Sequence, residues 1–114
     1  MQLIKTNEIP FRDNKPTGVK YFARGPNPGG IDWGMIALAP GENLDMHWHE
    51  SVEETFYIQE GFPTIEVDEK PFALSPGDAL LVMPHEKHHI KNTGKEQAKM
   101  IFIKNCYAPS DKRP

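Results

Sequence analysis

The sequence is poor in cysteine, in long apolar runs and in basic charge, and each shortage argues against a class of protein. Cys106 is the only cysteine among 114 residues, so the chain cannot form an internal disulfide and implies no oxidising compartment. No stretch approaches the roughly 18 apolar residues of a membrane span, and the first residues lack the apolar run of a signal peptide. We therefore expect a soluble cytoplasmic protein without a membrane partner.

The charge balance argues against nucleic acid as a partner. Lysine and arginine number 13 against 16 aspartates and glutamates, and the formal net charge is −3 with no basic run. Nucleic-acid binding would need a basic patch or stripe, so we expect none. The hydrophobic share of 38% is ordinary for a folded chain, and 114 residues suit one domain. We expect a single domain over residues 1–114.

Sustained helical periodicity is also missing, and short alternating or apolar runs take its place. Eleven prolines and nine glycines are scattered along the chain, and turn signals recur about every 8 to 12 residues. This pattern predicts an all-β sandwich or barrel. The core of the barrel should span about residues 31–105, with residues 1–30 forming extra strands or an arm and the tail from Pro109 loose. The expected strands are 31–39, 44–49, 54–59, 64–67, 72–74, 79–83, 88–91 and 97–105.

Two histidines at strand spacing are the first candidate site residues. His47 and His49 are two residues apart, so in a strand both imidazoles point to the same face. Glu54 opens the next expected strand, and it shares a face with Phe56 and Ile58. A carboxylate in such apolar company is costly unless it is paired or coordinated, which a metal ion would achieve.

Glu53 is the alternative ligand, but its face-mates look more exposed, and we favour Glu54. His88 begins a later strand and can supply a fourth ligand from across the barrel. Three imidazoles and one carboxylate suit one divalent transition metal: Mn, Fe, Co, Ni, Zn or Cu. The alternative without a metal is that these histidines are ordinary surface or core residues. Their number and spacing make us favour the metal site.

Two spaced motifs resemble those of the cupin superfamily. The residues that match the first cupin motif are Gly41, His47, His49, Glu54 and Gly61. Those that match the second are Gly77, His88 and Asn92. In the second motif, Met83 stands where the family has proline and His85 where it has glycine. The resemblance covers about residues 35–105. It implies a jelly-roll barrel, also called a double-stranded β-helix, a metal held by three His and one Glu, and often a homodimer.

The departure at His85 leaves two interpretations open. The glycine of the family serves a tight turn, and His85 either occupies a reshaped surface turn or lies at the barrel mouth as a proton-transfer group. We keep it as a candidate catalytic residue. His89 alternates with His88 and should face away from the site.

The expected ligand is a small molecule that can replace water on the metal. The site would carry a net charge of about +1, which favours an anionic oxygen chelator such as a carboxylate or an enediolate. The pocket-wall candidates are apolar, although core packing also explains them. Arg24 is a candidate clamp for an acid. The wall candidates are Trp33, Met35, Phe56, Ile58, Met83 and Ile90.

Three functions remain open from the sequence. The first is a metal-dependent enzyme of dioxygenase, decarboxylase or isomerase type that acts on a small anionic or polyoxygenated metabolite. The second is a non-catalytic module that binds a small ligand, and the third is a sugar isomerase-like protein. The fold does not choose among them.

Overall fold

The computed structural model describes residues 1–23 and 30–114, and nearly all of its regular structure is β. Antiparallel pairing connects every strand to a neighbour, which confirms the all-β prediction. The elements in chain order are η1 (Thr6–Glu8), η2 (Arg12–Asn14), β1 (Gly18–Ala23), β2 (Asp32–Leu38), β3 (Trp48–His49), β4 (Glu54–Glu60), β5 (Thr64–Val67), β6 (Lys70–Ala73), β7 (Ala79–Val82), β8 (His88–Lys91), β9 (Ala98–Lys104) and β10 (Lys112–Arg113).

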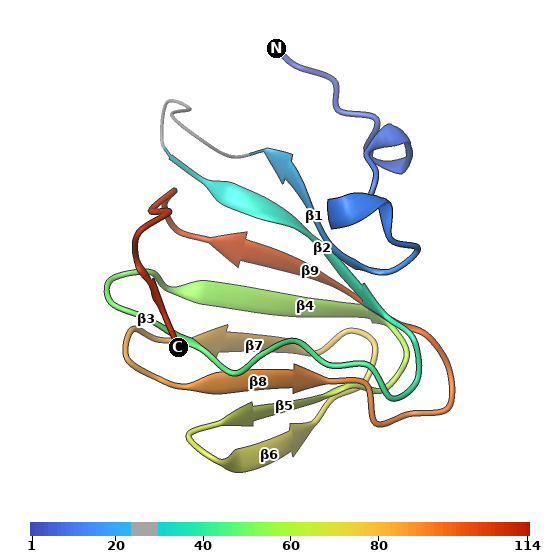
Figure 1. The fold of residues 1–114 in the computed structure, drawn as a ribbon, viewed down its shortest axis with the longest axis vertical. Coiled ribbons are helices and arrows are strands. Elements are labelled where there is room, and N and C mark those ends of the chain that lie inside the picture. Colours follow the sequence, from blue (N-terminus) through green and yellow to red (C-terminus); the bar gives the residue numbers. More distant parts are fainter. Residues whose placement is uncertain (24–29) are drawn as a thin grey trace.

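Two sheet layers enclose the interior (Figure 1). The larger layer has five strands in the order β1-β2-β9-β4-β7. The other layer contains the three strands β6-β5-β8 and the pair β10-β3. Isolated antiparallel bridges join Asn43 to Lys91 and His47 to His88. The segment before β3 therefore lies beside β8, and this contact joins the three-stranded sheet to the β10-β3 pair. This connection brings His47 and His49 beside His88.

The core lies on the inner face of the five-stranded sheet. On β4 and β9, alternate residues are fully buried, among them Phe56, Ile58, Met100 and Phe102. Side chains that alternate in this way face the opposite layer, as the pleat requires. The cluster continues into the opposite layer through Ile65 and Ile90, and burial of these apolar side chains stabilises the barrel.

The inward face of β2 differs from the face expected from the sequence. Asp32, Gly34 and Ile36 are buried, whereas Trp33 and Met35 are half-buried and belong to the other face. As candidates for the pocket wall, Trp33 and Met35 were expected to face inward. The inward face instead contributes Ile36 and Leu38 to the core. Because Gly34 on this face has no side chain, the sequence does not show the even-numbered residues as an apolar face.

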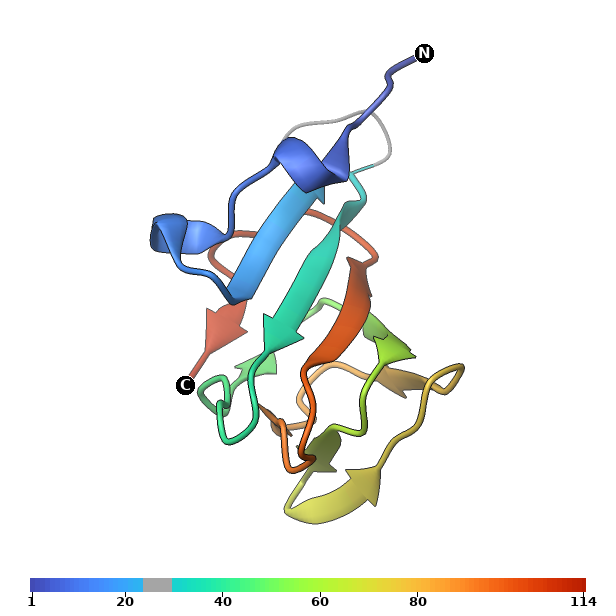
Figure 2. The same ribbon diagram turned by 90° about the vertical axis from the view of Figure 1, so that its right-hand side faces the viewer.

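The N-terminal residues form an extra strand, one of the two forms expected for residues 1–30. β1 pairs antiparallel with β2, and the segment before it lies along β1 (Figure 2). Lys20 on β1 is nearly buried there, and its Nζ donates hydrogen bonds to the carbonyl oxygens of Thr6 and Ile9 at 3.0 Å and 3.3 Å. The segment is therefore fastened to the sheet.

The C-terminal tail is not loose, and that expectation is wrong. β10 pairs with β3, and Asp111 beside it is buried. The Asp111 carboxylate accepts hydrogen bonds from the backbone amides of Ser51 and Val52, each at 3.0 Å. The tail's polar composition concealed this anchor, because the partners are backbone groups that no sequence pattern reveals.

The motif residues Gly61 and Asn92 hold loops beside the barrel. Gly61 has φ +80°, and a Cβ there would lie 2.5 Å from the carbonyl oxygen of Gln97, so a side chain is excluded. Asn92 is buried, and its amide donates to the carbonyl oxygens of Leu38 and Glu96 at 2.8 Å each. None of the helices in the described ranges has the length and apolar character to cross a bilayer.

Candidate metal centre

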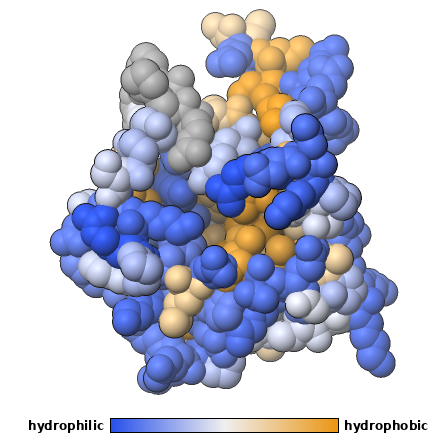
Figure 3. Space-filling view, in the orientation of Figure 1, coloured by the Kyte–Doolittle hydropathy of each residue, from blue (hydrophilic) through white to orange (hydrophobic). Residues whose placement is uncertain are grey.

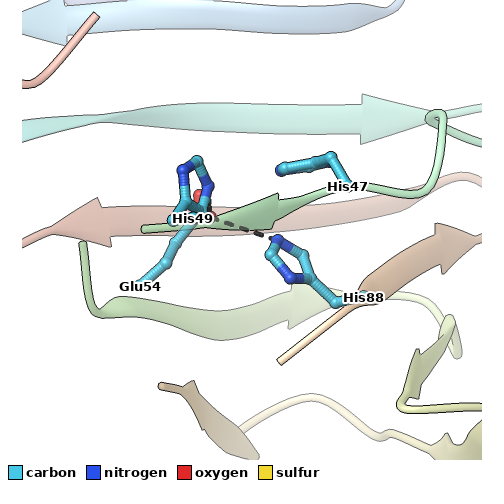
Figure 4. A group of neighbouring side chains, drawn as sticks. All are labelled: His47, His49, Glu54 and His88. Atoms are coloured by element: carbon cyan, nitrogen blue, oxygen red, sulfur yellow. Dashed lines mark ion pairs between the residues drawn. The ribbon is translucent and has the colours of Figure 1, made fainter. Parts of the chain in front are cut away.

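The structure brings together the three histidines and the glutamate that the sequence selects (Figure 4). We call His47, His49, Glu54 and His88 the ligand cluster. Each offers one nitrogen or oxygen atom, and these four atoms lie within 4.8 Å of one another. The residues come from the segment ending in β3, the first position of β4 and the first position of β8. Three separate elements thus converge on one point.

Burial leaves several of these atoms without an ordinary partner. His49, Glu54 and His88 are at most 4% exposed. Glu54 Oε1 lies 3.3 Å from His49 Nε2 and 3.5 Å from His88 Nε2, and neither contact has hydrogen-bond geometry. Buried polar atoms are normally satisfied, so this set is costly as it stands. A cation at the centre would satisfy all of them, and nitrogen and carboxylate donors fit a divalent transition metal.

Backbone carbonyl groups orient two of the imidazoles. His47 Nδ1 lies 3.0 Å from the carbonyl oxygen of Asp45, and His88 Nδ1 lies 3.1 Å from that of Glu86. If each Nδ1 carries the proton and donates it, each Nε2 keeps its lone pair for the cluster. Such contacts behind the ligands typically fix the tautomer of a metal-binding histidine.

The protonation states also favour a cation. Burial lowers the pKa of His47 to about 4, so its imidazole is neutral at physiological pH. Burial alone would raise the pKa of Glu54, but the adjacent His49 and His88 imidazoles and the positive charge of Lys104 lower it to about 2. The carboxylate is therefore charged. A neutral imidazole and an ionised carboxylate are the forms that bind metals.

Comparison with known proteins identifies the family. Residues 34–104, more than half of the chain, match the family model described as the Cupin domain. The chain belongs to the cupin family. This confirms the resemblance carried by the two motifs, and it accounts for the double-sheet barrel.

Two curated proteins from Streptomyces are similar in sequence to this cupin. The chain is 33% identical over 76 residues to the tetracenomycin polyketide synthase protein TcmJ of Streptomyces glaucescens, covering 67% of this chain and 51% of TcmJ. It is 32% identical over 76 residues to the polyketide synthase CurC of Streptomyces cyaneus, covering 67% of this chain and 49% of CurC. The cupin thus spans about half the length of these relatives.

A solved structure from Klebsiella pneumoniae shares the fold over nearly the whole chain. It is described as an uncharacterized conserved protein with a double-stranded β-helix domain. Its TM-score is 0.80 at 14% identity, and the match covers 99% of this chain and 96% of the other. At that identity the likeness shows the fold alone.

A cavity of about 220 Å³ opens beside the ligand cluster. His47 and Glu54 reach its wall, and apolar side chains from β1, β2, β8 and β9 form much of the rest. Figure 3 shows apolar surface at the centre of the face seen in Figure 1, framed by hydrophilic residues. The other lining residues are Arg12, Val19, Tyr21, Ile36, Asn43, Leu44, Asp45, Ile90, Phe102, Lys104 and Lys112.

Most of the expected wall residues lie elsewhere. Trp33, Met35 and Met83 are absent from the cavity lining, and Met83 is 43% exposed on the surface. Phe56 is buried behind the site, with its ring centroid 5.9 Å from that of His88. Ile90 does line the cavity.

The remaining expected wall residue is Ile58, which is fully buried in the core and does not line the cavity. Arg24, suggested as a clamp, lies outside the described residues. The structure thus gives no support to the substrate-binding role expected of four residues, because none of them lines the cavity: Trp33, Met35, Phe56 and Met83.

The structure decides between two neighbouring carboxylates and places His89 apart. Glu54 points into the cluster, whereas Glu53 is half-exposed. His89 lies outside the cluster, with its Nε2 2.9 Å from Asn43 Oδ1. Both placements agree with strand alternation.

Sequence reasoning missed the charged residues of the cavity. Lys104 shares the inward parity of Met100 and Phe102 on β9, so alternation alone could have found it. Arg12 and Lys112 belong to the two ends of the chain, where no motif or clear periodicity predicts a contact with the barrel.

His85 occupies the exposed turn before β8 and not the cavity. Its φ is +72°, the left-handed conformation that glycine favours, and its ring centroid lies 5.4 Å from that of Trp48. Of the two interpretations open from the sequence, this placement supports the reshaped surface turn.

The exposed position of His85 predicts that His85→Gly keeps the metal content of the parent. The free energy of unfolding should stay within about 1 kcal/mol, because relief of the left-handed backbone is offset by a freer unfolded chain. Elemental analysis and thermal denaturation check this. Loss of metal would instead give His85 a role in supporting the site.

Proposed function

We propose that this cupin is a metal-dependent enzyme that acts on a small anionic or polyoxygenated metabolite. The observation that carries the proposal is the ligand cluster itself: four donor atoms within 4.8 Å of one another, with buried atoms that have no hydrogen-bond partner. A bound divalent metal supplies Lewis-acid chemistry at such a site by polarising oxygen groups. The adjoining cavity gives a substrate access from one side.

The chain's own residues would prepare the site. Glu54 contributes the negative charge that holds a cation, and the contacts of His47 and His88 with backbone carbonyls keep their rings in place. The apolar side chains of Ile36, Ile90 and Phe102 form one part of the lining. Apolar surroundings lower the local dielectric constant, which strengthens electrostatic contacts with a bound molecule.

The relatives support the polyoxygenated class of substrate. TcmJ and CurC are named as polyketide synthase proteins, and polyketides carry many oxygen functions. A dioxygenase, a decarboxylase and an isomerase all remain candidate reaction types. The alternative is a module that binds the same kind of molecule without converting it, and turnover assays with purified protein separate the two.

Elemental analysis of protein purified without chelator tests the metal site directly. We expect about one equivalent of Mn, Fe, Co, Ni, Zn or Cu per chain at pH 7. The metal should dissociate as the pH falls toward about 5, because ligating imidazoles must be neutral. Burial lowers the pKa of His47 to about 4, so this ring stays neutral to a lower pH than an ordinary histidine. Release of the metal should therefore begin at about pH 5 and be complete only at about pH 4. Metal retained in full at pH 4 would contradict ligation by three histidines.

A further inference from the structure

The cavity beside the ligand cluster carries three cationic side chains that neither motif contains. Arg12 comes from η2, Lys104 ends β9 and Lys112 begins β10. We call these three residues the cationic wall. The carboxylates in the lining are Asp45 and Glu54, so the cations exceed them by one before any metal is counted. A divalent metal would increase this excess further, which favours an anion in the cavity.

The strand register directs Lys112 toward the site. Lys112 lies directly opposite His49 in the antiparallel pair of β10 and β3. Residues opposite one another in such a pair project to the same face of the sheet. Lys112 therefore extends on the side where His49 enters the ligand cluster. The hydrogen bonds of Asp111 to the backbone amides of Ser51 and Val52 hold this strand in position.

The cationic wall is only partly compensated by the protein. Lys104 Nζ lies 3.3 Å from the Tyr21 hydroxyl and 4.0 Å from Asp32 Oδ2. No ion pair involves Arg12 or Lys112 within residues 1–23 and 30–114.

The charges of the wall act on one another. Partial burial lowers the pKa of Lys112, and the positive charges of Arg12 and Lys104 lower it further. The carboxylates of Glu54 and Asp45 oppose this shift but do not cancel it. Like charges gathered at one cavity repel one another, and a bound anion would relieve that repulsion.

We propose that the cationic wall selects a small organic acid, whose carboxylate is held by Lys112 and Arg12 while its other oxygen functions face the ligand cluster. The second contact rests on the proposed metal-dependent function, whereas the first depends only on the three cations. The cavity volume of about 220 Å³ lies below the range of about 300–1,000 Å³ for pockets of drug-sized ligands, so the acid is small.

Calorimetric binding of malonate tests this inference, with malonamide as the uncharged probe of similar shape. Lys112→Gln and Arg12→Gln should each raise the Kd for malonate about tenfold, because each removes a charge-assisted contact. Binding of malonamide should be unaffected by either change. Lys70→Gln is the matched control, since Lys70 is exposed on β6 and does not line the cavity.

Each protein is measured both as purified and after removal of metal by a chelator, and thermal melts confirm that the variants fold. A tenfold loss in Lys112→Gln that persists without metal supports the inference even if the purified parent contains no metal and the proposed function fails. Malonate binding that matches the parent in Lys112→Gln and Arg12→Gln overturns it, whatever the metal content. An equal loss in Lys70→Gln, or a parent that binds no malonate in either form, also overturns it.

Discussion

Glu54→Gln will lose the metal while the barrel stays folded. The substitution preserves the size of the side chain but removes the charge that pairs with a cation, and Glu54 is 4% exposed with two imidazoles within 3.5 Å. Loss of a residue that merely supports a ligand typically costs 10- to 100-fold in metal affinity, so loss of the carboxylate ligand should cost at least about a hundredfold. Elemental analysis and a competition titration with a chelator measure the change.

Glu53→Gln is the matched control for this prediction. It makes the same chemical change at the adjacent residue, whose side chain is half-exposed and outside the cluster. We expect the control to retain the metal. After metal is removed from all three proteins by a chelator, the thermal melts of both variants should resemble that of the parent. Equal metal affinity in Glu54→Gln and the parent would refute Glu54 as the carboxylate ligand. A loss of metal in Glu53→Gln alone would assign that ligand to Glu53.

Gly34→Ala will destabilise the protein by about 3 kcal/mol, since a small increase in size has no space at this position. A Cβ on Gly34 would lie 2.1 Å from the carbonyl oxygen of Lys20 and 2.9 Å from Cζ of Phe102. The first contact is with backbone, so β1 and β2 would have to separate. Denaturant titration measures the change in the free energy of unfolding. The melting temperature should fall by more than about 10 °C.

Gly94→Ala is the corresponding control. A Cβ on Gly94 would make its nearest contact at 3.4 Å, with Asn92 Oδ1, and Gly94 has no positive φ. Its free energy of unfolding should therefore change by less than about 1 kcal/mol. Gly34→Ala should also alter the cavity, because Phe102 lines it. A Gly34→Ala protein as stable as the parent would show that the strands separate without cost.

The sequence predicted the features that repeat along a strand or a motif. Alternation selected Glu54 over Glu53, and the spacing of His47 and His49 with His88 predicted one convergent cluster, which the structure contains. The turn signals predicted most strands of the barrel. The strand expected over residues 44–49 reduces to β3, Trp48–His49, with isolated bridges before it.

The sequence failed where long-range contacts override local pattern. The face of β2 was misassigned because Gly34, which carries no side chain, occupies an inward position that only the approach of β1 requires. The buried tail and the cationic wall depend on backbone partners and on the meeting of both ends of the chain, which alternation cannot reveal. The homodimer, the cytoplasmic location and the single-domain boundaries stay predictions.

The pairing of β10 with β3 makes the ligand cluster and its cavity depend on an intact C-terminal segment. Cleavage after Ala108 would remove Asp111 and Lys112 together, release the amides of Ser51 and Val52, and uncover the edge of β3 that carries His49. A single proteolytic event at the surface would thus change charge, access and ligand support at once. Intact mass therefore belongs beside metal content in the characterisation of every preparation, since a trimmed fraction would resemble a defective variant.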